Sequence, residues 1–168
     1  MKERVAACLY ADVNGYCLLI GADVQSTVHT LTAYRALMTR MVVKHGGRVV
    51  DMAGDSFLAE FSTIARAVRC AIDLQRELSD HNSGLPPGRR VEFRVGIDLG
   101  NVLVHGGRIY GNCVNTAARV QSIAPPGSVC IAESAFDRLD APLARQFEYH
   151  GEHVVKNIDR PLRVYRTE

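Results

Sequence analysis

Apolar and polar positions along the chain alternate between the short period of strands and the longer period of helices. Val5 to Leu9 is a continuous apolar run, typical of a buried strand. From Asp23 to Lys44 apolar residues recur three or four positions apart, which predicts a helix with Asp23 as its N-cap and Gly46-Gly47 after its end. The predicted inward stripe of this helix comprises Val24, Val28, Leu31, Tyr34, Met38, Met41 and Val42.

A hairpin and a second helix follow. Val49-Val50 and Phe57-Leu58-Ala59 flank Gly54-Asp55, the pattern of two short strands joined by a turn. A second helical period begins near Ser62 or Thr63 and ends at Asn82-Ser83-Gly84.

The second half of the chain contains further strands and one helix. Val91 to Val95 alternates as a half-buried strand that continues through Ile97. A turn is expected at Gly100-Asn101, after which Val102 to Val104 would return antiparallel. The remaining expected elements are a Gly-rich loop at 106–111, a helix at 114–123, and strands at 129–132 and 162–165.

This order of elements, β-α-β-β-α-β with additions, predicts an α+β sandwich with a ferredoxin-like core. We expect a mostly antiparallel sheet with helices on one face. The sequence shows no internal repeat and no interdomain linker, so residues 1–168 are expected to form a single domain.

Composition and charge narrow the possible functions. No stretch approaches the roughly 20 apolar residues of a membrane span, and the N-terminus lacks the pattern of a signal peptide. We therefore expect a cytoplasmic domain without membrane contact. The net charge is +2 and the basic residues are scattered, so no nucleic-acid partner is expected.

Cysteines and histidines give no metal signature. The five cysteines (Cys8, Cys17, Cys70, Cys113 and Cys130) form no C-x-x-C motif and are expected to be reduced and mostly buried. His150 and His153 have the spacing of metal ligands, but solvated loop histidines are the favoured interpretation.

Two carboxylates at turns are the strongest chemical signal. Asp12 ends the first apolar run, and Asp55 lies at the expected hairpin tip. If the two strands lie side by side, both carboxylates reach one point at the end of the sheet. Paired carboxylates beside a loop suit two divalent cations and a polyphosphate.

Three weaker features accompany this pair. Arg94 lies on the polar face of its strand, Asn115 and Arg119 lie four positions apart on one helix, and Asn14-Gly15-Tyr16 can turn backbone N–H groups toward an anion. Each has an ordinary alternative: a solvated cation, a surface pair and a plain loop.

Taken together and in order, these motifs resemble the catalytic domain of the class III adenylate and guanylate cyclases. The resemblance runs almost end to end. The segments that carry it are residues 5–12, 45–50, 54–55, 93–97, 110–119 and 155–165.

The resemblance implies a two-metal site. Asp12 and Asp55 would bind two divalent cations, Mg²⁺ or Mn²⁺, with the Val13 carbonyl as an extra ligand. One cation would lower the pKa of the ribose 3′-hydroxyl, and the other would hold the triphosphate of ATP or GTP.

The resemblance also assigns the residues that bind the nucleotide. Asn115 would orient the ribose, Arg119 would stabilise charge on the α-phosphate, and Arg94 would bind phosphate. Lys156 falls near a phosphate-contacting lysine of the family. In this family the aspartates and the Asn/Arg helix come from different subunits, which implies a homodimer.

The purine-selecting positions depart from the family pattern. Adenylate cyclases of the family usually carry a lysine and an aspartate where this chain has Asp51 and Arg108. Asp51 could accept hydrogen bonds from guanine N1–H and N2, while Arg108 donates to O6, so base polarity favours GTP. ATP remains open, as does a simple pair between Asp51 and Arg108 that fills the pocket.

The leading hypothesis is a purine nucleotide cyclase, with possible regulatory domains outside this chain. The alternative is a non-catalytic cyclase homology domain that serves as a dimerisation or nucleotide-sensing module. A palm-like domain of the diguanylate cyclase or polymerase type ranks last, because it does not explain Asn115 and Arg119.

Overall fold

The computed structural model describes residues 1–167, and one sheet of eight strands runs through them. The strands are β1 (Lys2–Val13), β2 (Arg48–Ala53), β3 (Ser56–Phe61), β4 (Phe93–His105), β5 (Arg108–Tyr110), β6 (Val129–Ala132), β7 (Glu148–His153) and β8 (Leu162–Arg166). The helices are α1 (Tyr16–Ala22), α2 (Val24–Lys44), α3 (Ile64–Ser83), α4 (Asn112–Ser122), α5 (Glu133–Phe136) and α6 (Ala141–Ala144), with a 3₁₀ turn at Pro87–Arg89.

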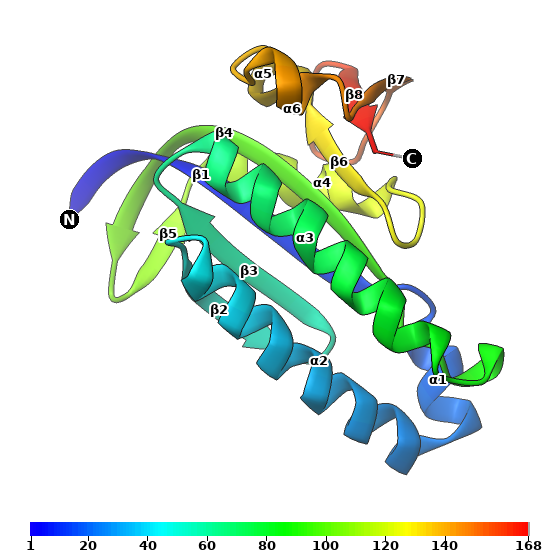
Figure 1. Cartoon of the computed structure of the whole chain (residues 1–168). Coiled ribbons are helices and arrows are strands. Elements are labelled where there is room, and N and C mark those ends of the chain that lie inside the picture. Colours follow the sequence, from blue (N-terminus) through cyan, green and yellow to red (C-terminus); the bar gives the residue numbers. More distant parts are fainter. Residues whose placement is uncertain (168) are drawn as a thin grey trace.

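The strand order confirms the predicted fold class. Strands follow one another as β2-β3-β1-β4-β6-β8-β7, and β5 pairs with β4. Within residues 1–167 only β4 and β6 pair in parallel, and the other neighbouring strands are antiparallel. The first part of the chain, β1-α2-β2-β3-α3-β4, is the expected ferredoxin-like core (Figure 1).

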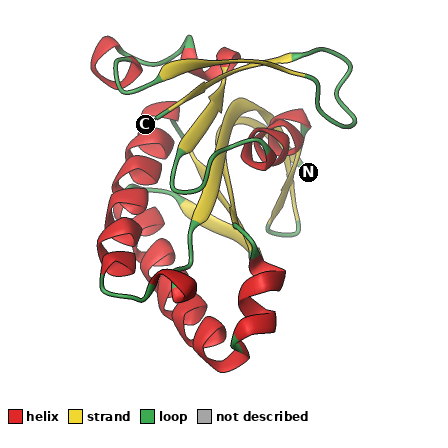
Figure 2. Cartoon of the chain, turned by 90° about the vertical axis from the view of Figure 1, so that its right-hand side faces the viewer, coloured by secondary structure: helices red, strands yellow, loops and turns green. Residues whose placement is uncertain are grey.

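The helices do not all cover one face, which corrects one detail of the prediction. α2 and α3 lie on one side of the sheet, and α4 lies on the other (Figures 1 and 2). β1 is buried on both sides: Leu9 belongs to the core under α2 and α3, whereas Cys8 packs with Cys113 of α4. Small residues at the α4 contact, such as Ala117, allow this helix to approach the sheet closely.

The two long helices begin where the sequence predicts. The side chain of Asp23 accepts a hydrogen bond from the Ser26 N–H at 2.9 Å, and Thr63 caps α3 in the same way. The predicted inward stripe of α2 is wrong at its first positions, where Val24 and Val28 are 56% and 47% exposed. These turns extend beyond the end of the sheet and have no strand to cover (Figure 1).

The predicted turn at Gly100-Asn101 is also wrong, because β4 continues to His105. The chain reverses instead at Gly106-Gly107, whose φ angles of 59° and 76° suit a tight hairpin between β4 and β5. A Cβ at Gly100 would lie 3.0 Å from Cys113, so this glycine makes room for α4.

The cysteine prediction is confirmed: all five are unpaired, and every one except Cys17 is buried. Within residues 1–167, none of the helices combines the length and apolar character needed to cross a membrane. The sequence did not predict α1, α5, α6, β5 or β7, whose apolar patterns are short.

Candidate functional site

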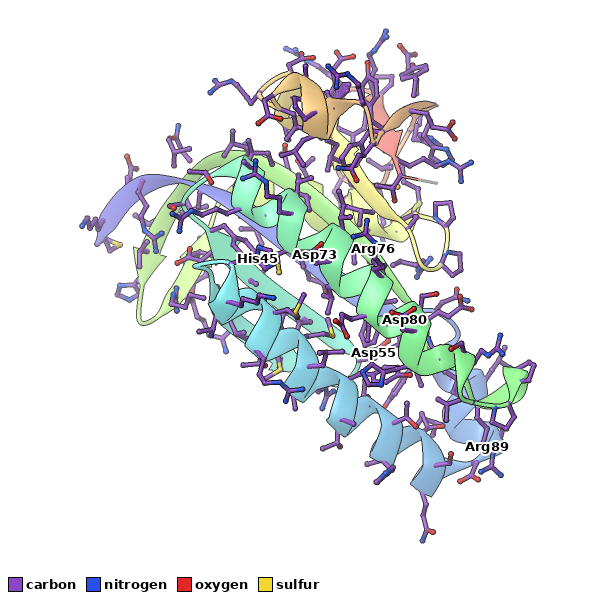
Figure 3. The ribbon with its side chains drawn as sticks, viewed as in Figure 1. His45, Asp55, Asp73, Arg76, Asp80 and Arg89 are labelled. Carbon is purple, nitrogen blue, oxygen red and sulfur yellow. The ribbon has the colours of Figure 1, made fainter. Side chains whose placement is uncertain are left out.

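Strand register brings Asp12, Asp55 and Arg94 together at one end of the sheet. Asp12 lies directly opposite Arg94 of β4 and opposite Ser56 of β3. Asp55 precedes Ser56 in the β2–β3 turn, where Gly54 has a φ of 58°. Figure 3 labels Asp55 at this turn. The predicted meeting of the two carboxylates therefore follows from the pairing of β1 with β3.

The surroundings of Asp12 favour its protonated form. Burial, followed by a hydrogen bond and charge repulsion from Asp55, raises the pKa of Asp12 to about 7. The Val13 N–H, 2.8 Å from Oδ1, and the positive charge of Arg94 act in the opposite direction. A cation bound between the two carboxylates would offset their repulsion and favour their charged forms.

The donor set fits a divalent cation that also binds phosphate. Val13 is 3% exposed and packs in the core, and its main-chain carbonyl is its only oxygen, because a valine side chain has none. Among residues 1–167, no cluster of three or more His, Cys, Asp or Glu side chains forms a complete metal cage. Mg²⁺ is commonly bound by one or two carboxylates together with substrate phosphates, which is what this site would require.

Arg94 is anchored by the end of α4. Its Nη1 donates a hydrogen bond to the carbonyl of Ser122 at 3.1 Å, where the helix dipole favours a positive charge. The buried Nε makes no hydrogen bond within residues 1–167. The side chain thus keeps donors for an anion near Asp12.

Asn115 and Arg119 line a cavity of about 270 Å³ together with Ala118, Asn157 and Ile158, and neither Asp12 nor Asp55 lines it. The opposite side of α4, including Cys113 and Ala117, packs on the sheet. Lys156 precedes Asn157 in the β7–β8 connection and is exposed. One protomer therefore presents the two groups of predicted residues separately.

Sequence reasoning missed Asn157, although it lies inside one of the segments that resemble the cyclases. Its φ of 65° is unusual for a residue other than glycine, and asparagine tolerates this conformation better than most. The tight turn brings the 155–158 segment over α4.

A larger cavity lies elsewhere, and none of the predicted site residues lines it. It has a volume of about 590 Å³ and lies between α3, the start of β6 and residues 145–148. Size alone therefore does not locate the chemistry of this protein.

The two purine-selecting candidates contact each other. Arg108 Nη1 lies 3.4 Å from Asp51 Oδ2, and the side chains are 60% and 42% exposed. The pairing that the sequence left open is therefore present in the protomer. It is a long, exposed ion pair, which contributes little to stability.

The predicted phosphate loop is available only in part. The N–H of Asn14 donates to the Glu92 carbonyl at 2.8 Å and is not available to an anion. Gly15, with φ of 67°, is the N-cap of α1, so the first N–H groups of that helix, including Tyr16, lack helical acceptors. The main-chain N–H of Asn14 is thus already bonded, whereas those of Gly15 and Tyr16 stay candidates.

Known proteins are similar to this chain in sequence and in fold. The family model "Adenylate and Guanylate cyclase catalytic domain" matches residues 2–165. A putative adenylate cyclase 3 of Rhizobium meliloti is 36% identical over 167 residues, which cover 98% of this chain and 28% of that protein. The chain thus spans less than half the length of the curated relatives it matches first.

Solved structures of cyclases are also similar to this chain. An adenylate/guanylate cyclase/hydrolase from Silicibacter pomeroyi has a TM-score of 0.85 and 34% identity, covering 99% of this chain and 98% of that one. The adenylyl cyclase CyaB from P. aeruginosa has a TM-score of 0.83 at 20% identity, covering 99% and 95%, and supports the fold alone. Because the family model matches residues 2–165, the chain belongs to the adenylate and guanylate cyclase catalytic domain family.

Proposed function

We propose that this chain is a purine nucleotide cyclase that converts ATP or GTP into the 3′,5′-cyclic monophosphate and pyrophosphate. The observation that carries the proposal is the meeting of Asp12 and Asp55, with Arg94 on the adjacent strand. Two carboxylates and a cation at one point suit a metal-bound triphosphate. Membership of the cyclase family supports the same reaction class.

The chain's own residues would bind and orient the triphosphate. Two divalent cations, Mg²⁺ or Mn²⁺, held by Asp12, Asp55 and the Val13 carbonyl would supply an acidified 3′-hydroxyl and charge balance on the leaving pyrophosphate. Arg94, anchored by Ser122, would bind phosphate oxygens. The N–H groups of Gly15 and Tyr16 would add neutral donors.

The residues of α4 and its neighbouring loop would act at the reacting phosphorus. Asn115 would orient the ribose so that O3′ attacks the α-phosphorus while the bond to the β-phosphate oxygen breaks. Arg119 would stabilise the charge that develops there, and Lys156 would contact the phosphates.

We further propose that two copies share each site. The cavity at Asn115 and Arg119, about 270 Å³, is smaller than the range of about 300–1,000 Å³ common for ligand pockets. The aspartates lie outside it. A twofold dimer that sets the aspartates of one copy against α4 of the other would form two equivalent sites.

A product assay tests the reaction. Purified protein with Mn²⁺ is offered ATP and GTP separately, and cyclic products are identified by mass spectrometry. Cyclic AMP or cyclic GMP is expected from the wild type. Asp12→Ala should lower the rate by about 10²–10³, as for removal of a major electrostatic stabiliser. If that variant keeps more than about a tenth of the rate, the metal assignment is wrong.

A mixing experiment tests the shared site. Asp12→Ala and Arg119→Ala proteins should each be inactive, yet their equal mixture should recover about a quarter of the wild-type rate, because half of random dimers hold one intact site. If mixed dimers are shown to form and activity does not return, each site belongs to one protomer.

A non-catalytic module is the second candidate, and the Asp51–Arg108 contact favours it. In that case the ion pair would fill the position expected for the purine. A verified dimer that binds nucleotide and forms no cyclic product would support this role over catalysis.

A further inference from the structure

A bulge in β2 places Arg48 and Asp51 on the same side of the sheet. Arg48 is opposite Glu60 of β3 and Asp51 is opposite Leu58, with the register shifting between Val49 and Asp51. In a regular strand, positions three apart point to opposite faces. The extra residue therefore puts Arg48 beside one member of the Asp51–Arg108 pair.

The buried side chain of Glu60 anchors Arg48. The Glu60 side chain is 4% exposed, and its Oε1 accepts hydrogen bonds from Arg4 Nη2 and from Arg48 Nε, the latter at 3.1 Å. Oε2 makes no hydrogen bond within residues 1–167, so both arginines share one oxygen. A buried carboxylate requires such cations, and it holds the Arg48 guanidinium in one orientation.

The other end of the Arg48 guanidinium reaches the β4–β5 hairpin. Arg48 Nη1 donates to the carbonyl of Gly107 at 2.9 Å, immediately before Arg108. β2 and the β4–β5 hairpin are thus joined twice, by Arg48–Gly107 and by Arg108–Asp51. The second contact is long and exposed, so it holds the hairpin only weakly by itself. The first is anchored in the buried Glu60.

We propose that Arg48 is a positioning residue for guanine recognition: it ties Gly107 to Glu60 and thereby keeps Arg108 beside Asp51. The inference rests on the proposed function. The contact between Arg108 and Asp51 leaves other guanidinium N–H groups and carboxylate lone pairs available to a base. Guanine offers N1–H and N2 donors to the acid and O6 to the cation. Adenine has no such match, so loss of the tether should weaken GTP more than ATP.

The test is binding of 3′-deoxy-GTP and 3′-deoxy-ATP, which lack the attacking hydroxyl, measured by calorimetry with Mg²⁺. Wild type should bind the guanine analogue more tightly. Arg48→Met should weaken the guanine analogue about tenfold, as for one lost charge-assisted hydrogen bond, and change the adenine analogue less than about twofold.

Arg4→Met is the matched control. It removes the other partner of Glu60 and leaves the Arg48–Gly107 bond, so the ratio of the two affinities should remain that of wild type. Arg48→Lys keeps a positive charge at Glu60 but lacks the fork that reaches Gly107. It should lower the ratio as Arg48→Met does, which covers the case in which the methionine variant fails to fold.

The outcomes separate this inference from the proposed reaction. An unchanged affinity ratio in folded Arg48→Lys, or a wild type that prefers the adenine analogue, overturns the role of Arg48. A wild type that shows the expected ratios yet forms no cyclic product contradicts catalysis and supports the positioning role. A chain that binds neither analogue overturns both.

Discussion

The two faces of the sheet differ in what they contain. Under α2 and α3 the side chains are large and apolar, including Leu9, Met38, Phe57, Phe61, Leu74 and Phe93. On the α4 side small and ionisable residues lie beside apolar ones such as Val102 and Ile109; they include Ala6, Cys8, Gly96, Ala117, Asp12, Glu60, Arg94 and Asp98. Alternation along β1 assigns each residue to one face or the other. One face holds most of the large apolar core, and the other holds the proposed site residues.

Two carboxyl groups and one thiol on the α4 face lie in environments that disfavour their charged forms. Burial is the main cause that raises the pKa of Asp12 to about 7 and that of Asp98 to about 6. Cys8, which lies between Glu60 and Asp98 in the register, has its pKa raised by a hydrogen bond with Cys113 and by burial. Burial of these ionisable groups lowers the stability of the fold, and apolar burial on the other face must offset this loss.

Phe61→Ala should produce the largest loss of stability. Phe61 is 2% exposed on the apolar face, and removing a buried aromatic ring typically costs about 3–5 kcal/mol. Urea denaturation measures this as a lower midpoint. Nucleotide affinity of the molecules that remain folded should not change. A loss below about 1 kcal/mol would show that this face does not carry the fold.

Asp55→Ala should show the reverse pattern. The turnover rate should fall by about 10²–10³ because the residue would hold a metal. The midpoint of urea denaturation should hold or rise, because the variant removes repulsion of Asp12. A parallel loss of stability and activity would mean that Asp55 is structural.

Asp98→Asn separates charge from shape on the α4 face. The folded pKa of Asp98, about 6, exceeds its ordinary 3.8, so the folded state holds the proton more tightly. Its contribution to stability is therefore complete below pH 3.8 and is lost as pH rises through about 6. The free energy of unfolding of wild type relative to Asp98→Asn should fall by up to about 3 kcal/mol over this range. A difference that is flat from pH 4 to 7 would contradict the burial argument.

Gly96→Ala should lower stability and turnover together. A Cβ at Gly96 would lie 2.3 Å from backbone atoms of Ala117 and Gln121, so α4 must shift. We expect a loss of about 1–3 kcal/mol and a reduced turnover, because α4 carries Asn115 and Arg119. Gly88→Ala, with open space around it, is the control and should leave both unchanged.

Local signals in the sequence predicted much of the fold. The cap at Asp23, the apolar period of α2 and the turn at Gly54-Asp55 depend on residues close together in the chain. The meeting of Asp12 and Asp55 followed from the same signals once the strands were paired. The order of motifs then indicated the family, which the comparisons confirmed.

Tertiary contacts decided what the local signals did not. β4 passes through Gly100 because α4 packs on that glycine, and small residues on the second face allow α4 to approach closely. The Asp51–Arg108 contact joins residues 57 positions apart. Alternation by itself determined that each strand has two faces. Long-range packing decided which face carries the large apolar core and which carries the proposed site residues, because helices distant in sequence pack on each face.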